Sequence, residues 1–188
     1  MISIINVNNN NINEIIKNLK ERSNTINIRK SVEEIIENIK LHGNKALREY
    51  TLKFDNVELK DFLISNEEIE EAYKQCDKTM LRILEECKNN ITKYHEKQKE
   101  TGYIYQKELG IYMGQRIIPV DSVGVYVPGG KAAYPSSVLM NIIPAQVAGV
   151  QDIIISTPPN YNNKVNSNIL VAARVCGINK IYKIGGAQ

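Results

Sequence analysis

Three short segments combine glycine, proline and hydrogen-bonding side chains directly after apolar runs. They are PGGK at residues 128–131, STPP at 156–159 and GGAQ at 185–188. Adjacent glycines let the backbone come close to a ligand, a lysine supplies a cation, and the side-chain amide of Gln188 both donates and accepts hydrogen bonds. Such groups suit a phosphate-bearing nucleotide bound near a helix N-terminus. We therefore expect the three segments to meet at a nucleotide site.

A structural interpretation of the same segments stays open. Pro-Gly-Gly is common in ordinary turns, and the chain contains neither G-x-G-x-x-G nor a Walker motif. Spacing alone favours a dinucleotide site only modestly over a structural loop. It also does not decide whether Lys131 contacts a phosphate, or whether Ser136 and Ser137 reach a ligand.

The apolar runs that lead to these segments alternate with helical stretches. SVGVYV, DIIIS and KIYKI are typical of strands, while residues 136–149 and 167–177 are typical of helices. Ser136 is expected to cap the first helix, and Pro144 to kink it or split it at Ile143. The pattern predicts an open α/β fold with a parallel sheet buried on both faces. Ligands bind outside the carboxyl ends of the strands in such sheets.

The earlier part of the chain has a different pattern. Residues 13–100 are predicted to be helical, and SVEE (31–34) and SNEE (65–68) are both expected to cap helix starts. One apolar stripe runs from Ile69 to Tyr94, and Cys87 on it is expected to be a core residue. Residues 103–106 and 111–118 predict an antiparallel hairpin. The predicted domains are a helical segment at 1–110 and the sheet-bearing part at 111–188.

Composition narrows the class of protein. The 188 residues carry a net charge of +3, with 18 basic and 19 acidic side chains in residues 1–110 but 6 and 2 in residues 111–188. This distribution hints at an anionic small ligand and does not fit a nucleic-acid binder. No apolar run is long enough to cross a membrane, and the three cysteines form no CxxC pair, so a cytoplasmic protein is expected.

The chain offers few groups for catalysis or metal binding. His42 precedes a glycine at an expected helix C-terminus, where capping explains it, and His95 is expected to be solvated. A catalytic zinc site needs about three protein ligands, which two separated histidines do not supply. We assign no catalytic residue and expect no metal held by this chain alone.

Two long stretches resemble the N-terminal half of the L-histidinol dehydrogenase family. They are QRIIPVDSVGVYVPGGKAAYPSSVLMNIIPAQVAGVQDIIISTPP and KIYKIGGAQ, and the earlier HGNKALREYTLKFDNVEL is similar to the family's helical N-terminal segment. The resemblance covers nearly the whole chain. It implies a zinc-dependent enzyme that oxidises L-histidinol through L-histidinaldehyde to L-histidine with two NAD, in the last two steps of histidine biosynthesis.

The resemblance also implies a fold, an assembly and site residues. The fold is aldehyde-dehydrogenase-like, with an incomplete Rossmann-like open parallel sheet preceded by a helical N-terminal segment, and the family enzyme is an intertwined homodimer. Tyr126 and Gln188 match NAD-binding positions, and Gly129 and Gly130 form the glycine loop beside them. Without the motif match, Tyr126 would be read as a core aromatic of a buried strand.

Length is where the chain departs from the family. Family chains are more than twice as long, and the resemblance places their zinc ligands and proton-transferring residues after GGAQ. We therefore expect a fragment that is inactive by itself. The alternatives are an NAD-binding module that regulates or complements a partner, and a structural product without activity. A generic aldehyde dehydrogenase is disfavoured, because no cysteine lies in a nucleophile setting.

Overall fold

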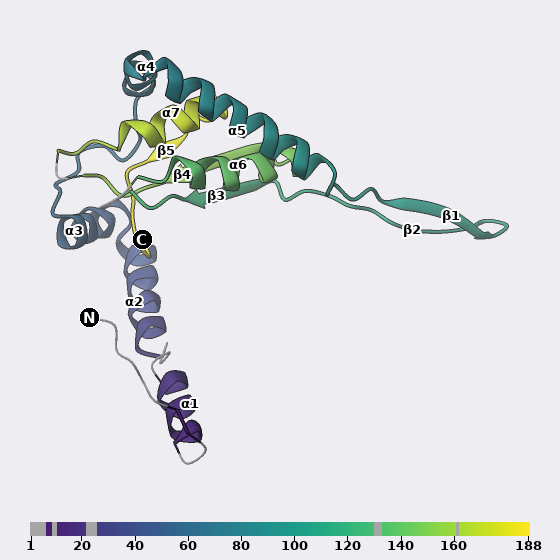
Figure 1. Cartoon of the computed structure of the whole chain (residues 1–188), viewed down its shortest axis with the longest axis horizontal. Helices are drawn as coiled ribbons and strands as arrows, with labels where there is room; N and C mark the ends of the chain where they lie inside the picture. The colour runs from purple at the N-terminus through teal and green to yellow at the C-terminus, as the bar shows by residue number, and fades with distance from the viewer. Residues whose placement is uncertain (1–6, 9–10, 22–25, 130–132, 161) are drawn as a thin grey trace.

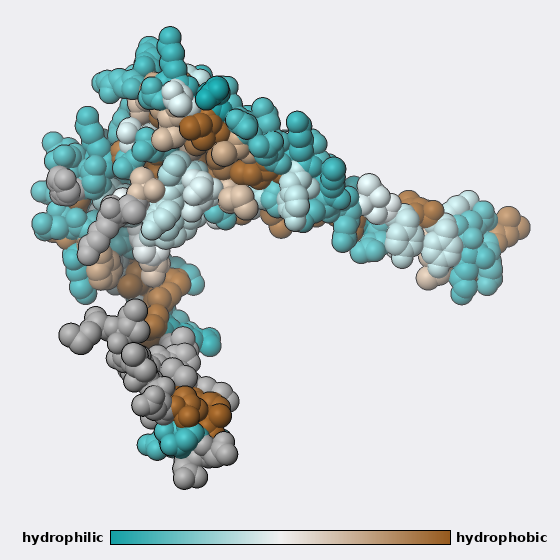
Figure 2. Space-filling view, in the orientation of Figure 1, coloured by the Kyte–Doolittle hydropathy of each residue, from teal (hydrophilic) through white to brown (hydrophobic). Residues whose placement is uncertain are grey.

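Two arms extend from a central body of helices and strands (Figure 1). The computed structural model describes residues 7–8, 11–21, 26–129, 133–160 and 162–188. Helices α1 (Ile12–Glu21) and α2 (Ile26–His42) form one arm, and the hairpin of β1 (Tyr103–Glu108) and β2 (Ile111–Gln115) forms the other. Figure 2 shows hydrophobic residues in brown on both arms, away from the body.

Helix α2 differs from the sequence prediction at its start. It begins five residues before Ser31, so the expected cap at SVEE is wrong and Ser31 lies inside the helix. An ion pair between Arg29 Nε and Glu33 Oε1, 2.8 Å apart, spans this position at i,i+4 spacing and favours helix on both sides of it. The C-terminus is as predicted: α2 ends at His42, and Gly43 has φ +54° before α3 (Asn44–Asp55) begins.

The predicted single stripe from Ile69 to Tyr94 is divided between two helices. Helix α4 (Asn66–Gln75) has the expected cap, since the Glu68 amide donates to Ser65 Oγ at 3.2 Å. Helix α5 (Lys78–Glu96) starts anew, with Asp77 as its cap. Cys87 is exposed, so its prediction as a core residue is wrong: α5 turns Met80, Leu84 and Ile91 to the core, and Cys87 lies beside that stripe.

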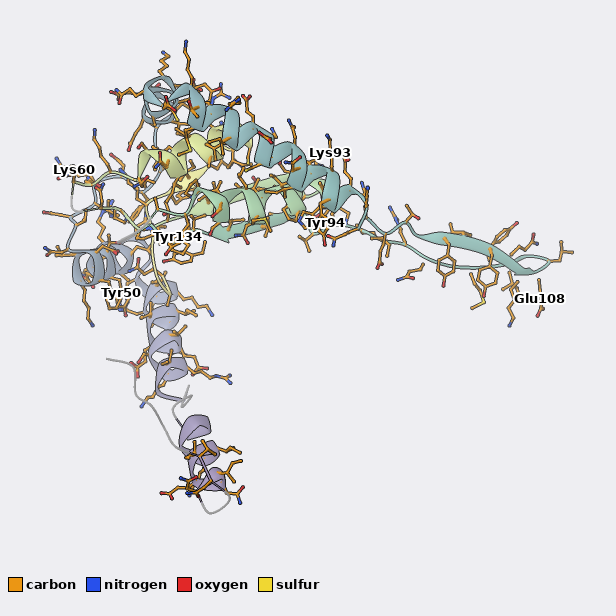
Figure 3. All side chains as sticks on the ribbon, in the orientation of Figure 1. Tyr50, Lys60, Lys93, Tyr94, Glu108 and Tyr134 are labelled. Atoms are coloured by element: carbon orange, nitrogen blue, oxygen red, sulfur yellow. The ribbon has the colours of Figure 1, made fainter. Side chains whose placement is uncertain are left out.

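The predicted hairpin is confirmed, although its second strand is shorter than expected. β2 ends at Gln115, before Ile117 and Ile118, and Gly110 takes φ +84° in the turn. Every residue of both strands is exposed. In Figure 3 the hairpin side chains, including the labelled Glu108, point into open space on both sides of the ribbon. The predicted boundary between residues 110 and 111 falls in this turn and stays a prediction.

A three-stranded parallel sheet forms the centre of the body. It contains β3 (Ser122–Tyr126), β4 (Asp152–Ser156) and β5 (Ile181–Tyr182) in the order β3-β4-β5. Helix α6 (Pro135–Ala148) connects the first pair and α7 (Ser167–Val175) the second. The predicted β-α-β-α-β order is confirmed. Leu63 adds an antiparallel bridge to Tyr182 at the outer edge of β5.

Helix α6 corrects the predicted cap and one of the two effects predicted for Pro144. Tyr134 occupies the N-cap position and Pro135 begins the helix, so Ser136 is its second residue and not its cap. The helix continues past Pro144 and is not split at Ile143. The proline removes the donor for the Met140 carbonyl, but Met140 is 53% exposed, so water can reach this side of the helix.

The helices cover one face of the sheet. Helices α6 and α7 pack against each other, and α5 and α4 pack on them in turn (Figure 1). Val125, Ile153, Ile155 and Ile181 are buried in this core. On the opposite face Tyr126 is 48% exposed, and Ile154 and Tyr182 are only partly buried. The expectation of burial on both faces therefore does not hold in this structure.

Candidate functional site

The carboxyl ends of the three parallel strands lie at one edge of the sheet. Tyr126 is the register partner of Ser156, which is in turn the partner of Tyr182. Partnered residues of neighbouring strands point to the same face, so these three side chains form a row on the face that the helices leave open. Tyr126 is therefore an accessible aromatic side chain, and its interpretation as a core residue fails.

Hydrogen bonds hold the strand ends together. The Val127 amide donates to the Ser156 carbonyl at 2.8 Å, and the Thr157 amide donates to the Tyr182 carbonyl at 3.0 Å. The Ser156 hydroxyl donates to the Ile184 carbonyl at 2.5 Å. The segment after β4 is thus bonded to both neighbours, which fixes the starting points of the loops that follow β3 and β5.

Two glycines allow these loops to approach the STPP segment closely. A Cβ placed on Gly129 would lie 2.6 Å from Thr157 Oγ1 and 3.2 Å from the Pro158 carbonyl oxygen. A Cβ on Gly185 would lie 2.7 Å from Pro158 Cβ. Neither position has room for a side chain. The predicted convergence of the three segments is therefore present in the described residues.

Two buried polar atoms at this edge have no partner among the residues that the structure describes. Gln188 Oε1 accepts from the Gly185 amide at 3.3 Å, but Gln188 Nε2 is buried and makes no hydrogen bond. Thr157 is fully buried, and its Oγ1 is also unpaired. Unpaired buried donors are uncommon in proteins, so each calls for a missing partner or a close-packing explanation.

The structure brings together most of the predicted site residues. Tyr126, Gly129 and Gln188 lie at the same edge of the sheet. Gly130 and Lys131 are outside the described residues. Thr157 of the STPP segment has no sequence signal for a role at the site, because its complete burial depends on tertiary packing.

Lys183 was also missed. It follows β5 directly, is 7% exposed, and its side chain forms no ion pair with any described residue. If the alternation of β5 continued, this buried position would be expected to hold an apolar residue. The lysine adds positive charge near the ends of the strands.

The histidines lie elsewhere. His42 Nδ1 is 2.7 Å from Asn38 Oδ1 on α2, and His95 Nδ1 is 2.7 Å from Gln98 Oε1 at the end of α5. Within the described ranges, no three side chains of the His, Cys, Asp and Glu types gather in a way that could hold a metal ion. Across those same ranges, no helix has the length and apolar character that a membrane crossing requires.

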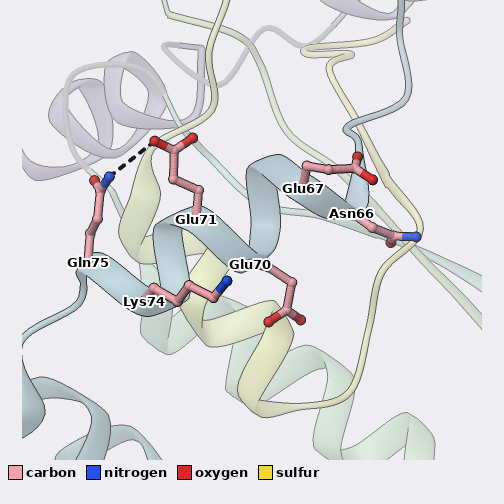
Figure 4. Close-up of a pocket in the computed structure, with 6 residues that line it drawn as sticks. All are labelled: Asn66, Glu67, Glu70, Glu71, Lys74 and Gln75. Carbon is pink, nitrogen blue, oxygen red and sulfur yellow. Dashed lines mark hydrogen bonds between the residues drawn. The ribbon is translucent and has the colours of Figure 1, made fainter.

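A pocket lies on α4 (Figure 4). Its lining residues come from this one helix and include Glu67, Glu70 and Glu71, and Gln75 Nε2 donates to Glu71 Oε1 at 3.1 Å. Hydrogen bonds from its own amide and from the Ser65 side chain lower the pKa of Glu67. Glu67 lies in the first turn of α4, where a carboxylate is favourable, and Glu70 forms an ion pair with Arg174.

Comparison with known proteins places this chain in a family. The sequence model for histidinol dehydrogenase matches residues 18–188. The chain belongs to the histidinol dehydrogenase family. The histidinol dehydrogenase of Clostridium acetobutylicum is 51% identical over 174 residues, which cover 92% of this chain and 40% of the relative. That of Bacillus subtilis is 49% identical over 160 residues, which cover 85% and 38%.

A solved structure supports the same conclusion. The crystal structure of histidinol dehydrogenase from Elizabethkingia anophelis matches with a TM-score of 0.80 and 37% sequence identity, over 86% of this chain and 37% of that one. The predicted mixed α/β fold with its small parallel sheet is thereby confirmed as that of a histidinol dehydrogenase. The chain spans about 40% of the length of the curated relatives it matches.

Proposed function

We propose that the carboxyl edge of the sheet is the part of a histidinol dehydrogenase that binds NAD. The complete reaction would be the oxidation of L-histidinol through L-histidinaldehyde to L-histidine. The observation that carries this proposal is the placement of Tyr126, Gly129 and Gln188 at one edge, in a chain that belongs to this family.

The residues present fit a dinucleotide. The half-exposed ring of Tyr126 offers a surface on which a planar base can stack, and the unpaired Nε2 of Gln188 offers a hydrogen-bond donor. Gly129 keeps this part of the loop free of a side chain, and Lys183, directly after β5, adds positive charge near the strand ends. NAD, when bound, supplies the acceptor for the hydride that leaves the substrate carbon.

The residues present do not fit zinc. His42 and His95 lie on different helices and already have amide partners, and no metal cluster occurs in the described ranges. We therefore derive no zinc-dependent step and no proton transfer from this chain. The proposal is that the 188-residue chain binds NAD but does not turn over L-histidinol by itself.

The same proposal includes a homodimer, an aldehyde-dehydrogenase-like architecture and a cytoplasmic location. The hairpin arm supports an assembly, because a two-stranded ribbon alone is marginally stable in water and every residue of both strands is exposed. The small parallel sheet is compatible with an incomplete Rossmann-like domain. The free state of Cys76, Cys87 and Cys176 is compatible with a reducing compartment.

A structural role without cofactor binding is the second candidate. It is favoured by the open face of the sheet, where Tyr126 would then be an interface residue that another polypeptide covers. NAD binding separates the two candidates.

The first experiment is calorimetric titration of the purified chain with NAD, beside a turnover assay that contains L-histidinol and zinc. Saturable binding without turnover is the expected result. Turnover would overturn the proposed inactivity, and an absence of binding by the folded chain would favour the structural role.

Tyr126→Ala tests the site itself. Loss of a stacking surface worth about 1.4 kcal/mol corresponds to roughly tenfold weaker NAD binding. Tyr103→Ala is the matched control, because Tyr103 is similarly exposed but lies on the hairpin arm. Equal affinity of the Tyr126 variant and the control, with folding intact, would remove Tyr126 from the site.

A further inference from the structure

The two glycine loops of the proposed site are joined by side-chain packing beyond the ends of the strands. The last hydrogen bonds between strand ends involve Val127, Ser156 and Thr157. Past these, no backbone hydrogen bond connects Gly129 or Gly185 to the STPP segment within the part of the chain that the structure describes. What connects them is contact with Thr157 and Pro158.

This contact leaves no space for a side chain at either glycine. Gly129 lies against Thr157 on one side, where an added Cβ would come within 2.6 Å of Oγ1. Gly185 lies against Pro158 on the other side, where an added Cβ would come within 2.7 Å of the proline Cβ. Real Cβ atoms do not approach so closely, so only glycine fits at either position, and a displacement of the dipeptide would alter both contacts.

The unpaired hydroxyl of Thr157 fits this arrangement. The Thr157 side chain is fully buried, yet its Oγ1 has no hydrogen-bond partner among the described residues. A buried hydroxyl without a partner is unfavourable. Its position against Gly129 indicates that the side chain is held there by packing.

We infer that the Thr157–Pro158 dipeptide sets the positions of the two loops relative to each other, because it contacts Gly129 in one loop and Gly185 in the other. We call these four residues the clasp. The inference rests on the proposed NAD site, since Tyr126 precedes one loop and Gln188 ends the other. Thr157 is accordingly a positioning residue: it acts on NAD through the loops and does not itself need to touch the dinucleotide.

The test is a cycle of variants followed by NMR of the backbone amides and by NAD titration. In Gly129→Ala, the new methyl group displaces Thr157, so the amide resonances of Gly185 and Gln188 shift although the substitution is in the other loop. NAD binding weakens by roughly tenfold, within the range of coupling between residues in contact. Adding Thr157→Ala to Gly129→Ala removes the closest contact, that with Oγ1, and restores part of both signals, while the 3.2 Å approach to the Pro158 carbonyl oxygen remains.

Gly124→Ala is the matched control. Gly124 lies on the strand before the same loop, and its added Cβ would meet only Ile154 Cγ1, at 3.9 Å. The Gly124→Ala substitution leaves the amide resonances of Gly185 and Gln188 unshifted. If Gly129→Ala leaves them equally unchanged, or if the double variant restores neither signal, the clasp is wrong.

A second variant covers the case in which Gly129→Ala does not fold. Thr157→Ala shrinks the clasp without any clash and shifts the amides of both Gly129 and Gly185. Its control is Thr51→Ala, since Thr51 is another fully buried threonine, on α3. Shifts on one side only would overturn the inference. Because the resonances are read without ligand, failure of the parent chain to bind NAD counts against the proposed function and not against the clasp.

Discussion

The two sheets of this chain have opposite surroundings. The parallel strands β3 to β5 have buried positions such as Ile155 under helices α6 and α7, whereas the antiparallel strands β1 and β2 have no buried residue. Both contain many apolar side chains. Apolar content therefore predicts a strand but does not tell whether the segments that cover the strand come from the same chain. For the parallel sheet, the connecting helices supply that cover.

Truncation of an apolar side chain is expected to give the largest difference between the two sheets, measured as the loss of unfolding free energy. Ile155→Ala in β4 removes a fully buried side chain and should lower the free energy of unfolding by about 2–5 kcal/mol. Ile104→Ala in β1, where the side chain is 80% exposed, should change it by less than about 0.5 kcal/mol. Urea unfolding measures both. A large loss in the Ile104 variant would mean that the hairpin is packed in solution.

Hydrogen exchange should show the next largest difference. Amides of β4, which is paired on both sides, are expected to exchange at least about a hundredfold more slowly than those of β1 and β2. The reason is that the hairpin can open without disturbing the core. Mass spectrometry of the exchanging chain provides the measurement, and similar protection in both sheets at low protein concentration would contradict it.

Cysteine reactivity gives a smaller contrast. Burial raises the pKa of the Cys176 thiol to about 11, against a partial lowering by Lys88, while Cys87 is exposed on α5. At pH 8 an aromatic disulfide reagent should modify Cys87 at least about tenfold faster than Cys176. Equal rates for the two thiols would contradict the buried position of Cys176.

The same thiol affects stability at high pH. Because the pKa is raised in the folded state, the contribution of the protonated Cys176 is complete below the ordinary value of 9.0 and is lost as the pH rises toward 11. Cys176→Ala should flatten that alkaline decline. Unfolding curves between these two pH values, with Cys87→Ala as the control, measure the change.

Sequence patterns predicted the body of the fold because its determinants are local. Short apolar runs bounded by Pro128 or followed by Gly185 predicted strands, and the Ser65 cap predicted the start of α4 correctly. Ser31 failed because the same local pattern also fits inside a helix that begins earlier. Cys87 failed because Asp77 starts a new helix, which changes the face that packs on the core.

The candidate site was predictable only in part. Strand ends of a parallel sheet meet at one edge, so Tyr126 and Gln188 could be placed together from the order of the elements. The roles of Thr157 and Lys183 depend on burial, which arises when segments distant in the sequence pack together. The open face of the sheet was missed because apolar strands such as DIIIS look the same whether one face or both are covered.

Two prolines limit what can add to the outer edge of the parallel sheet. β3 is an edge strand of five residues, with Pro119 three residues before its start and Pro128 two residues after its end. Proline lacks the amide hydrogen that a ladder needs, so any further strand paired to β3 gains at most roughly 17 Å of regular pairing. A short edge bounded in this way is a poor template for indefinite strand addition between molecules, which protects the chain from edge-to-edge aggregation.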